Sequence, residues 1–95
     1  MSLSERRYQR EMLKQIARRL SEASLDRLEL KLFARQVKVW FANMNAPAAQ
    51  WAATRVEDAC RASVEATTLA SRVWALEHEI MRLLRFVNWR TPAPV

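Results

Sequence analysis

The chain has 95 residues, of which 16 are Lys or Arg and 10 are Asp or Glu, so its formal net charge is +6 at pH 7. It contains no glycine, which excludes the glycine-rich loops that cradle nucleotide phosphates. A chain of this length has room for one domain and buries only a modest part of its surface, which favours association with other chains. Without a run of about 18 uncharged apolar residues or an apolar leader, we expect no membrane-spanning helix and a cytoplasmic location.

The first predicted element is a helix over residues 4–44. Apolar residues recur from Leu13 to Met44 at alternating steps of three and four, as in a coiled-coil helix, and Arg27 is the only polar member of this seam. A break is the alternative, with Ser24 capping a second helix and Asp26 near the positive end of its dipole. We expect one continuous helix, because the apolar register runs through this segment.

A turn over residues 43–46 follows. Pro47 suits the first position of a helix and pushes the preceding residue out of the helical region. Because no glycine is available, Asn43 or Asn45 is expected to take the left-handed conformation that ends the first helix.

The second predicted element is a helix over residues 47–90, because no proline or glycine interrupts residues 48–90. Its apolar seam runs from Ala59 to Val87 at the same alternating steps. Residues 92–95 are expected to form a flexible tail after the helix.

Together these elements predict an all-α fold with one domain over residues 1–91, an antiparallel helical hairpin of two long helices. Folding back near residue 46 sets the alanine-rich start of the second helix against the bulky end of the first, so that large side chains meet small ones. The hairpin is expected to assemble into a four-helix bundle or a larger helical oligomer.

The expected oligomer interface consists of apolar residues that flank the two seams, since one partner helix does not cover them. These residues are Leu25, Leu28, Leu32, Val39, Trp40, Trp74, Met81 and Leu84. In the same hairpin Arg27 lies opposite Glu65, so we expect this pair to set the register of the two helices.

Catalytic chemistry is poorly supported, because the chain has one His and one Cys. His78 and Cys60 lie about five turns apart on the second predicted helix and cannot meet within one chain. No Glu-x-x-His or Cys-x-x-Cys spacing is present, so we expect no metal, no cofactor and no enzymatic activity. His78 and Cys60 are interpreted as structural residues.

Basic residues form two candidate stripes for an anionic partner. The first stripe comprises Arg7, Arg10, Lys14 and Arg18, and the second comprises Lys31, Arg35 and Lys38 together with Arg27. Such stripes are able to follow a phosphate backbone. The alternative is a solvated helix face with local ion pairs.

Three functional hypotheses follow. The favoured one is a non-enzymatic, self-associating helical assembly module whose basic first helix docks an acidic protein surface. A basic accessory protein that contacts the phosphates of RNA or DNA is the second hypothesis. The third is a peripheral coat protein on a lipid or other hydrophobic surface.

Overall fold

The computed structural model describes residues 3–22 and 26–90 and contains four helices in these ranges, with no strand between or beside them. They are α1 (Leu3–Ser21), α2 (Arg27–Asn43), α3 (Pro47–Arg61) and α4 (Ala66–Arg90). The prediction of an all-helical fold is confirmed. The two predicted long helices, however, are each divided into two. The predicted tail, residues 92–95, lies outside the described residues.

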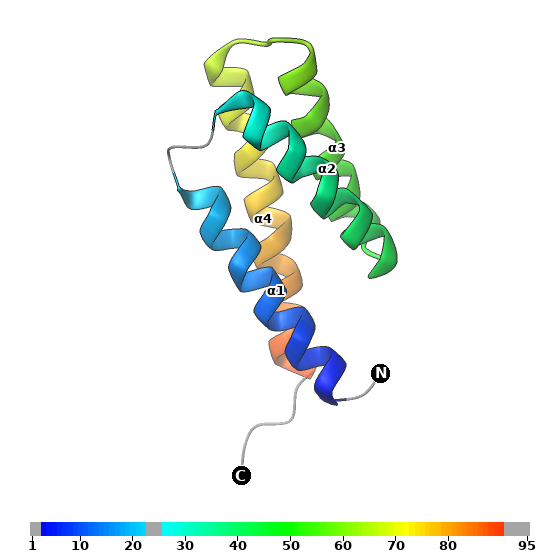
Figure 1. The fold of residues 1–95 in the computed structure, drawn as a ribbon. Coiled ribbons are helices and arrows are strands. Elements are labelled where there is room, and N and C mark those ends of the chain that lie inside the picture. Colours follow the sequence, from blue (N-terminus) through cyan, green and yellow to red (C-terminus); the bar gives the residue numbers. More distant parts are fainter. Residues whose placement is uncertain (1–2, 23–25, 91–95) are drawn as a thin grey trace.

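Successive helices run in opposite directions (Figure 1). α1 and α3 run away from the end where the termini lie, and α2 and α4 run back toward it. α2 packs on α3, α3 packs on α4, and α1 packs on α4. The molecule measures 48 × 23 × 17 Å, which is shorter than the roughly 60 Å that an uninterrupted hairpin of two 40-residue helices would span.

The chain reverses after α1, where the sequence predicts a continuous helix. The Ser21 hydroxyl turns back and donates to the carbonyl oxygen of Arg18 at 2.8 Å. α2 then begins with Asp26 as its cap, because the Asp26 carboxylate accepts a hydrogen bond from the backbone N–H of Glu29 at 2.7 Å. Ser24, the cap considered for a break here, lies outside the described residues.

The turn between α2 and α3 follows the sequence prediction. Asn45 has φ of 61°, and Pro47 occupies the first turn of α3. The N–H of Ala46 donates to the carbonyl oxygen of Phe41 at 3.0 Å, which satisfies a carbonyl that the end of α2 leaves without a helical partner. An asparagine therefore does what glycine does at most helix ends.

A second reversal divides the predicted helix over 47–90. Ser63 takes the left-handed conformation, with φ of 54°, and the N–H of Val64 donates to the carbonyl oxygen of Ala59 at 3.3 Å. This is the same closing pattern as at the end of α2. The segment contains no proline or glycine. The prediction of one continuous helix rested on the absence of these residues, and it therefore missed the break.

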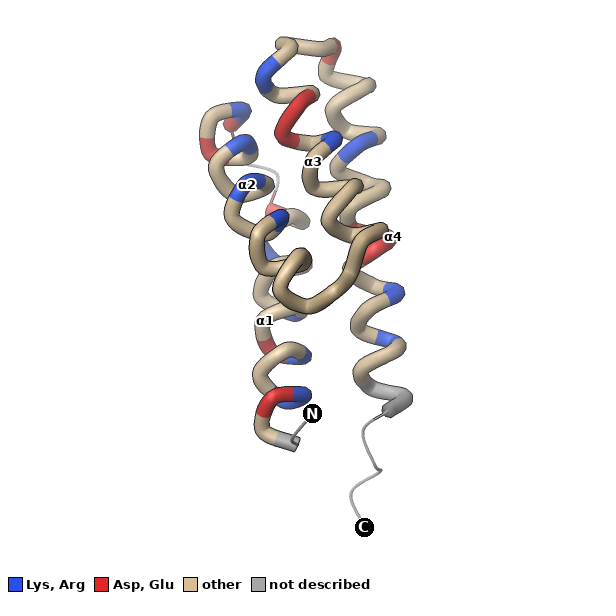
Figure 2. Tube along the Cα trace, turned by 90° about the vertical axis from the view of Figure 1, so that its right-hand side faces the viewer, with Lys and Arg blue, Asp and Glu red and all other residues tan. Residues whose placement is uncertain are grey.

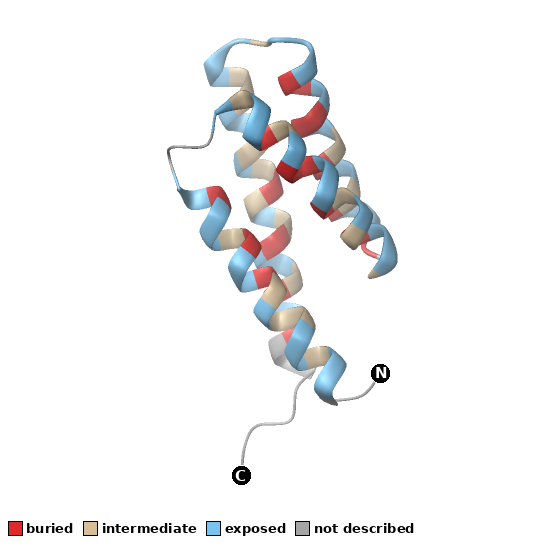
Figure 3. Ribbon diagram, in the orientation of Figure 1, coloured by how far each residue is buried: buried red, intermediate tan, exposed pale blue. Residues whose placement is uncertain are grey.

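The apolar sides of all four helices pack into one core, and the buried residues lie on the sides of the helices that face it (Figure 3). The most deeply buried large side chains are Leu13 from α1, Phe41 from α2, Val56 from α3, and Leu76 and Ile80 from α4. The two reversals are the physical alternative to a long hairpin. They gather apolar surface that a two-helix hairpin would leave in water, and burial contributes about 25 cal/mol per Å².

Candidate functional site

Apolar side chains remain exposed along the outer side of α2. Leu28 is 63% exposed, Leu32 50% and Val39 58%. Steps of four and seven place them on one side of the helix, opposite the buried Val37. We call these three residues the aliphatic face of α2. Isolated exposed leucines are common, but three aligned on one helix form a contiguous apolar surface.

A second exposed apolar surface follows the outer side of α4. Trp74 is 65% exposed and Met81 49%. His78 is exposed between them, and its ring stacks on that of Trp74 with centroids 5.4 Å apart and planes 19° apart. We call these three residues the aromatic face of α4.

Three members of the predicted oligomer interface are not part of these faces. Leu84 is buried at 8% exposure and belongs to the core. Trp40 is half-buried against the core, with its ring 5.6 Å from that of Phe41. For Leu84 the prediction is wrong, because folding into one core covers this side chain within the single chain. For Trp40, which is only partly covered, it stays a prediction. Leu25 lies outside the described residues.

The two faces point to opposite sides of the molecule. α3 packs against α2 and α4, and α1 packs against α4. α1 also touches α2, because the Arg19 guanidinium lies 5.5 Å from the centre of the Phe33 ring. α2 and α4 are thus diagonal in the ring of four helices, so that their outward sides face in opposite directions.

The second basic stripe is largely engaged within the molecule. Its positions follow α2 along its length (Figure 2), and Lys38 Nζ lies 2.8 Å from Glu57 Oε1 on α3. Glu57 is only 3% exposed, and Arg61 Nη2 lies 3.7 Å from its second oxygen. The Lys38 hydrogen bond and charge hold the pKa of Glu57 below its usual range, although burial acts in the opposite direction.

The sequence analysis did not identify the buried carboxylate of Glu57. Its only signal is a carboxylate beside the apolar positions Val56 and Cys60 in an alanine-rich helix. A carboxylate at such a position needs a cation opposite, and the fold-back at residue 46 supplies Lys38. Lys38 is therefore not available as a phosphate ligand in this structure. Lys31 is half-buried and Arg35 exposed.

Arg27 does not form the predicted register pair with Glu65. Its Nη2 donates instead to the carbonyl oxygen of Val64, the residue before Glu65, and no ion pair joins Arg27 to Glu65 in the described ranges. The second terminal nitrogen, Nη1, is buried without a hydrogen-bond partner. The guanidinium thus holds the turn between α3 and α4 through its backbone, because the chain leaves its helical path before residue 65.

The first basic stripe lies on α1. Arg7, Lys14 and Arg18 are exposed, whereas Arg10 is half-buried. Glu11 lies within this stripe, and its Oε1 is 3.8 Å from both Lys14 Nζ and Arg10 Nε. Exposed pairs at this distance contribute little free energy, so the exposed cations stay accessible to an anionic partner.

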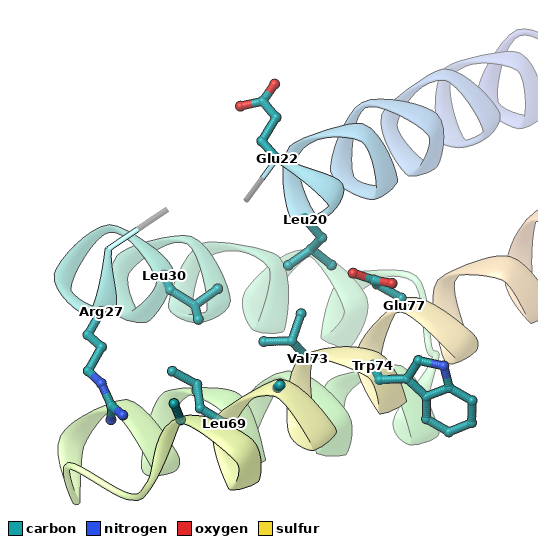
Figure 4. Close-up of a pocket in the computed structure, with 10 residues that line it drawn as sticks. Leu20, Glu22, Arg27, Leu30, Leu69, Val73, Trp74 and Glu77 are labelled. Atoms are coloured by element: carbon teal, nitrogen blue, oxygen red, sulfur yellow. The ribbon is translucent and has the colours of Figure 1, made fainter. Parts of the chain in front are cut away.

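An apolar groove of about 500 Å³ opens where the end of α1, the start of α2 and α4 meet (Figure 4). The side chains of Leu20, Leu30 and Val73 point into it, and Trp74 also lines it. Glu22, Arg27 and Glu77 supply its charged rim. Apart from these three rim groups the lining is apolar, aliphatic with one aromatic ring, so the described residues place no catalytic set here.

Cys60 is buried, and burial raises the pKa of its thiol, against the opposing charges of Arg27 and Lys31. Burial thus disfavours the thiolate, the form in which a cysteine acts as a nucleophile. Within residues 3–22 and 26–90, no group of three or more His, Cys, Asp or Glu side chains is arranged to hold a metal ion. No described helix is both long and apolar enough to cross a bilayer.

Comparison with protein-family models, with curated proteins and with solved structures finds no match to this chain.

Proposed function

We propose that this protein is a non-enzymatic, self-associating helical module. The observation that supports the proposal best is the aliphatic face of α2, three branched side chains that are each half-exposed or more. Full burial of a leucine or valine side chain stabilises by about 1.5–3 kcal/mol. Covering this face with another chain therefore provides a driving force for association that the folded single chain leaves unused.

The core of the single chain does not need these residues. α2 already buries Phe33, Val37 and Phe41 on its inward side, and its cap and closing turn are complete. A substitution on the outward side therefore tests association separately from folding. A variant on the aliphatic face that lost association but kept its helix content would therefore report on association alone.

The test is light scattering on the full chain at micromolar concentrations. We expect a mass of at least twice the 11.1 kDa of one chain, rising with concentration, for the wild type. Leu32→Glu should give the single-chain mass with unchanged helix content by circular dichroism. Gln36→Glu, which adds the same charge to an exposed polar position of α2, is the matched control and should behave as the wild type. A wild type that stays monomeric throughout would refute the proposal.

A second proposed role belongs to the basic residues of α1. Arg7, Lys14 and Arg18 are exposed on one side of this helix, and Glu11 pairs with the stripe through Lys14 and Arg10. We propose that this side docks an acidic protein surface. Phosphates of RNA or DNA are the alternative ligand of the same cations, as is an anionic lipid surface.

Binding measurements across a salt series distinguish these partners. Nucleic-acid binding should be weakly sequence-dependent and should fall steeply with salt, since each contact releases a counterion. Changing Arg7, Lys14 and Arg18 to Gln should flatten that dependence, and changing Arg72 and Arg82 on α4 is the control. Absence of binding at about 50 mM salt would eliminate nucleic acid, and absence of flotation with anionic vesicles would eliminate the lipid surface.

A further inference from the structure

We propose that copies of this chain associate head to tail, with the aliphatic face of α2 on one copy packed antiparallel against the aromatic face of α4 on the next. This inference rests on the proposed self-association and specifies its geometry. It follows from three properties of the two faces: their spacing, their charges and their positions on opposite sides of the molecule.

The spacing of the two faces matches. On α2 the outward positions 28, 32, 35 and 39 follow steps of four, three and four, and on α4 the positions 74, 78, 81 and 85 follow the same steps. Antiparallel helices with equal steps keep their outward positions opposite one another over the whole contact. This register sets Val39 against Trp74 and Leu32 against Met81, so that these two aliphatic side chains meet larger aromatic or flexible ones. It sets Leu28 against Arg85, whose aliphatic stem is long enough to cover it.

The charges beside the two faces are complementary in this register. Arg35 of one copy comes next to Glu77 of the other, and Glu29 comes next to Arg85. All four belong to the described residues, and none of them forms an ion pair within its own chain. Each interface therefore brings together two pairs of opposite charges that form no ion pair within the single chain, where Arg35 acts only at longer range on Glu57.

Pairing of like faces is disfavoured by the same charges. A two-fold contact places the same edge of both helices side by side. With α2 against α2, the edge that carries Lys31 and Arg35 meets its own copy and the cations repel. With α4 against α4, the two edges that carry Glu77 face one another. Like charges brought together across an interface oppose binding.

The placement of the two faces determines the kind of assembly. Because α2 and α4 are diagonal in the helix ring, a copy that uses one face keeps the other face available on its far side. A contact between two different faces is heterologous, and it grows into a ring or an open chain of copies instead of stopping at a dimer.

The test uses two variants that each block one face. Leu32→Glu blocks the aliphatic face of α2, and Met81→Glu blocks the aromatic face of α4. Each variant alone should lose all species larger than one chain. An equimolar mixture should form a one-to-one heterodimer and nothing larger, because each partner contributes the face that the other lacks. Circular dichroism of each variant establishes that it is folded, and both positions are about half-exposed.

A charge exchange provides the second measurement. Arg35→Glu alone should weaken association by about fivefold to tenfold, and Arg35→Glu combined with Glu77→Arg in the same chain should restore it. If α2 instead paired with α2, Arg35→Glu would strengthen association, and Met81→Glu would still dimerise. Either result would overturn the head-to-tail contact while leaving self-association intact. A monomeric wild type would eliminate both.

Discussion

The α2–α3 pair and the α1–α4 pair are held together in different ways. α2 and α3 pack with small residues on the α3 side, since Ala49 and Ala53 are completely or almost completely buried in the same core as Phe41 of α2. α1 and α4 meet through larger aliphatic side chains such as Leu13 and Ile80, both 0% exposed. Only the first pair adds a buried ion pair, between Lys38 and Glu57, among the interactions identified in the structure.

This difference shows how register is specified in a chain without glycine. Alanine lets two helices approach closely, so a large residue on one helix must meet a small one on the other. A buried carboxylate adds a further constraint, because it needs its cation at one position. Aliphatic packing alone is more tolerant of exchange between residues of similar volume. We therefore expect α2–α3 to be the specific pair and α1–α4 the adaptable one.

Truncation of the two largest fully buried side chains gives the largest expected effect. Phe41→Ala should lower the free energy of unfolding by about 3–5 kcal/mol and disrupt the whole molecule, because it opens a cavity between α2 and α3. Leu13→Ala should cost about 2–5 kcal/mol and should act first on α1. Hydrogen exchange followed by mass spectrometry distinguishes the two. If Leu13→Ala lowered the protection of backbone amides from exchange equally in α1 and α3, the proposed difference between the two helix pairs would be contradicted.

Removal of one partner from the buried ion pair comes next. Lys38→Met should lower the free energy of unfolding by about 3 kcal/mol, because the carboxylate of Glu57 is left buried without its main cation. The double variant Lys38→Met with Glu57→Met should recover most of this loss, since the charge is removed as well as its partner. Urea denaturation measures both, and Lys14→Met at an exposed position is the control. A double variant no more stable than Lys38→Met would show that the pair contributes through packing.

The same pair gives the protein a defined response to acid. The pKa of Glu57 is lower in the folded chain than the ordinary value of 4.5, so the folded state binds its proton less readily than the unfolded state does. Stability from this group is complete above that value and is lost as the pH falls through the folded pKa. We expect the wild type to lose more stability than the double variant between about pH 5 and pH 3.

Overpacking tests the role of small residues directly. Ala53→Leu, at a position that is 0% exposed, should cost about 1–3 kcal/mol because α2 and α3 can no longer approach closely. Ala17→Leu, on α1 at a partly buried position against the core, is the matched change and should cost less than about 1 kcal/mol. Thermal unfolding of the two variants makes the comparison. Similar costs at both positions would remove the distinction between the pairs.

The smallest effect concerns the left-handed turns. Ser63→Gly should stabilise by up to about 1 kcal/mol, because Ser63 has a positive φ that costs energy for a residue with a Cβ atom. Asn45→Gly should gain less, since asparagine tolerates this conformation. Differential scanning calorimetry resolves the ranking. A loss of stability in Ser63→Gly would show that its side chain contributes contacts beyond the turn.

Much of the local structure could be predicted from residue type. Asn45 and Pro47 mark the turn between α2 and α3 because their backbone preferences are strong and short-ranged. Ser63 carries no comparable preference, so the turn between α3 and α4 has no clear local signal. The candidate surface was predicted with mixed success. Leu28 and Leu32 are exposed as expected, whereas Leu84 is buried in the core that the four helices share.

The sequence by itself determines that the chain is helical and which side of each helix is apolar, because both properties depend on composition and on steps of three and four along the chain. Tertiary structure decided where the helices end and which side chains of neighbouring helices contact one another. An apolar seam is equally compatible with one long helix and with two that fold together, and the choice depends on how much surface the arrangement buries. The partner of Arg27 depends on that choice, since the Val64 carbonyl lies in the turn that separates α3 from α4. The partner of Glu57 follows instead from the reversal near residue 46, which brings Lys38 against α3.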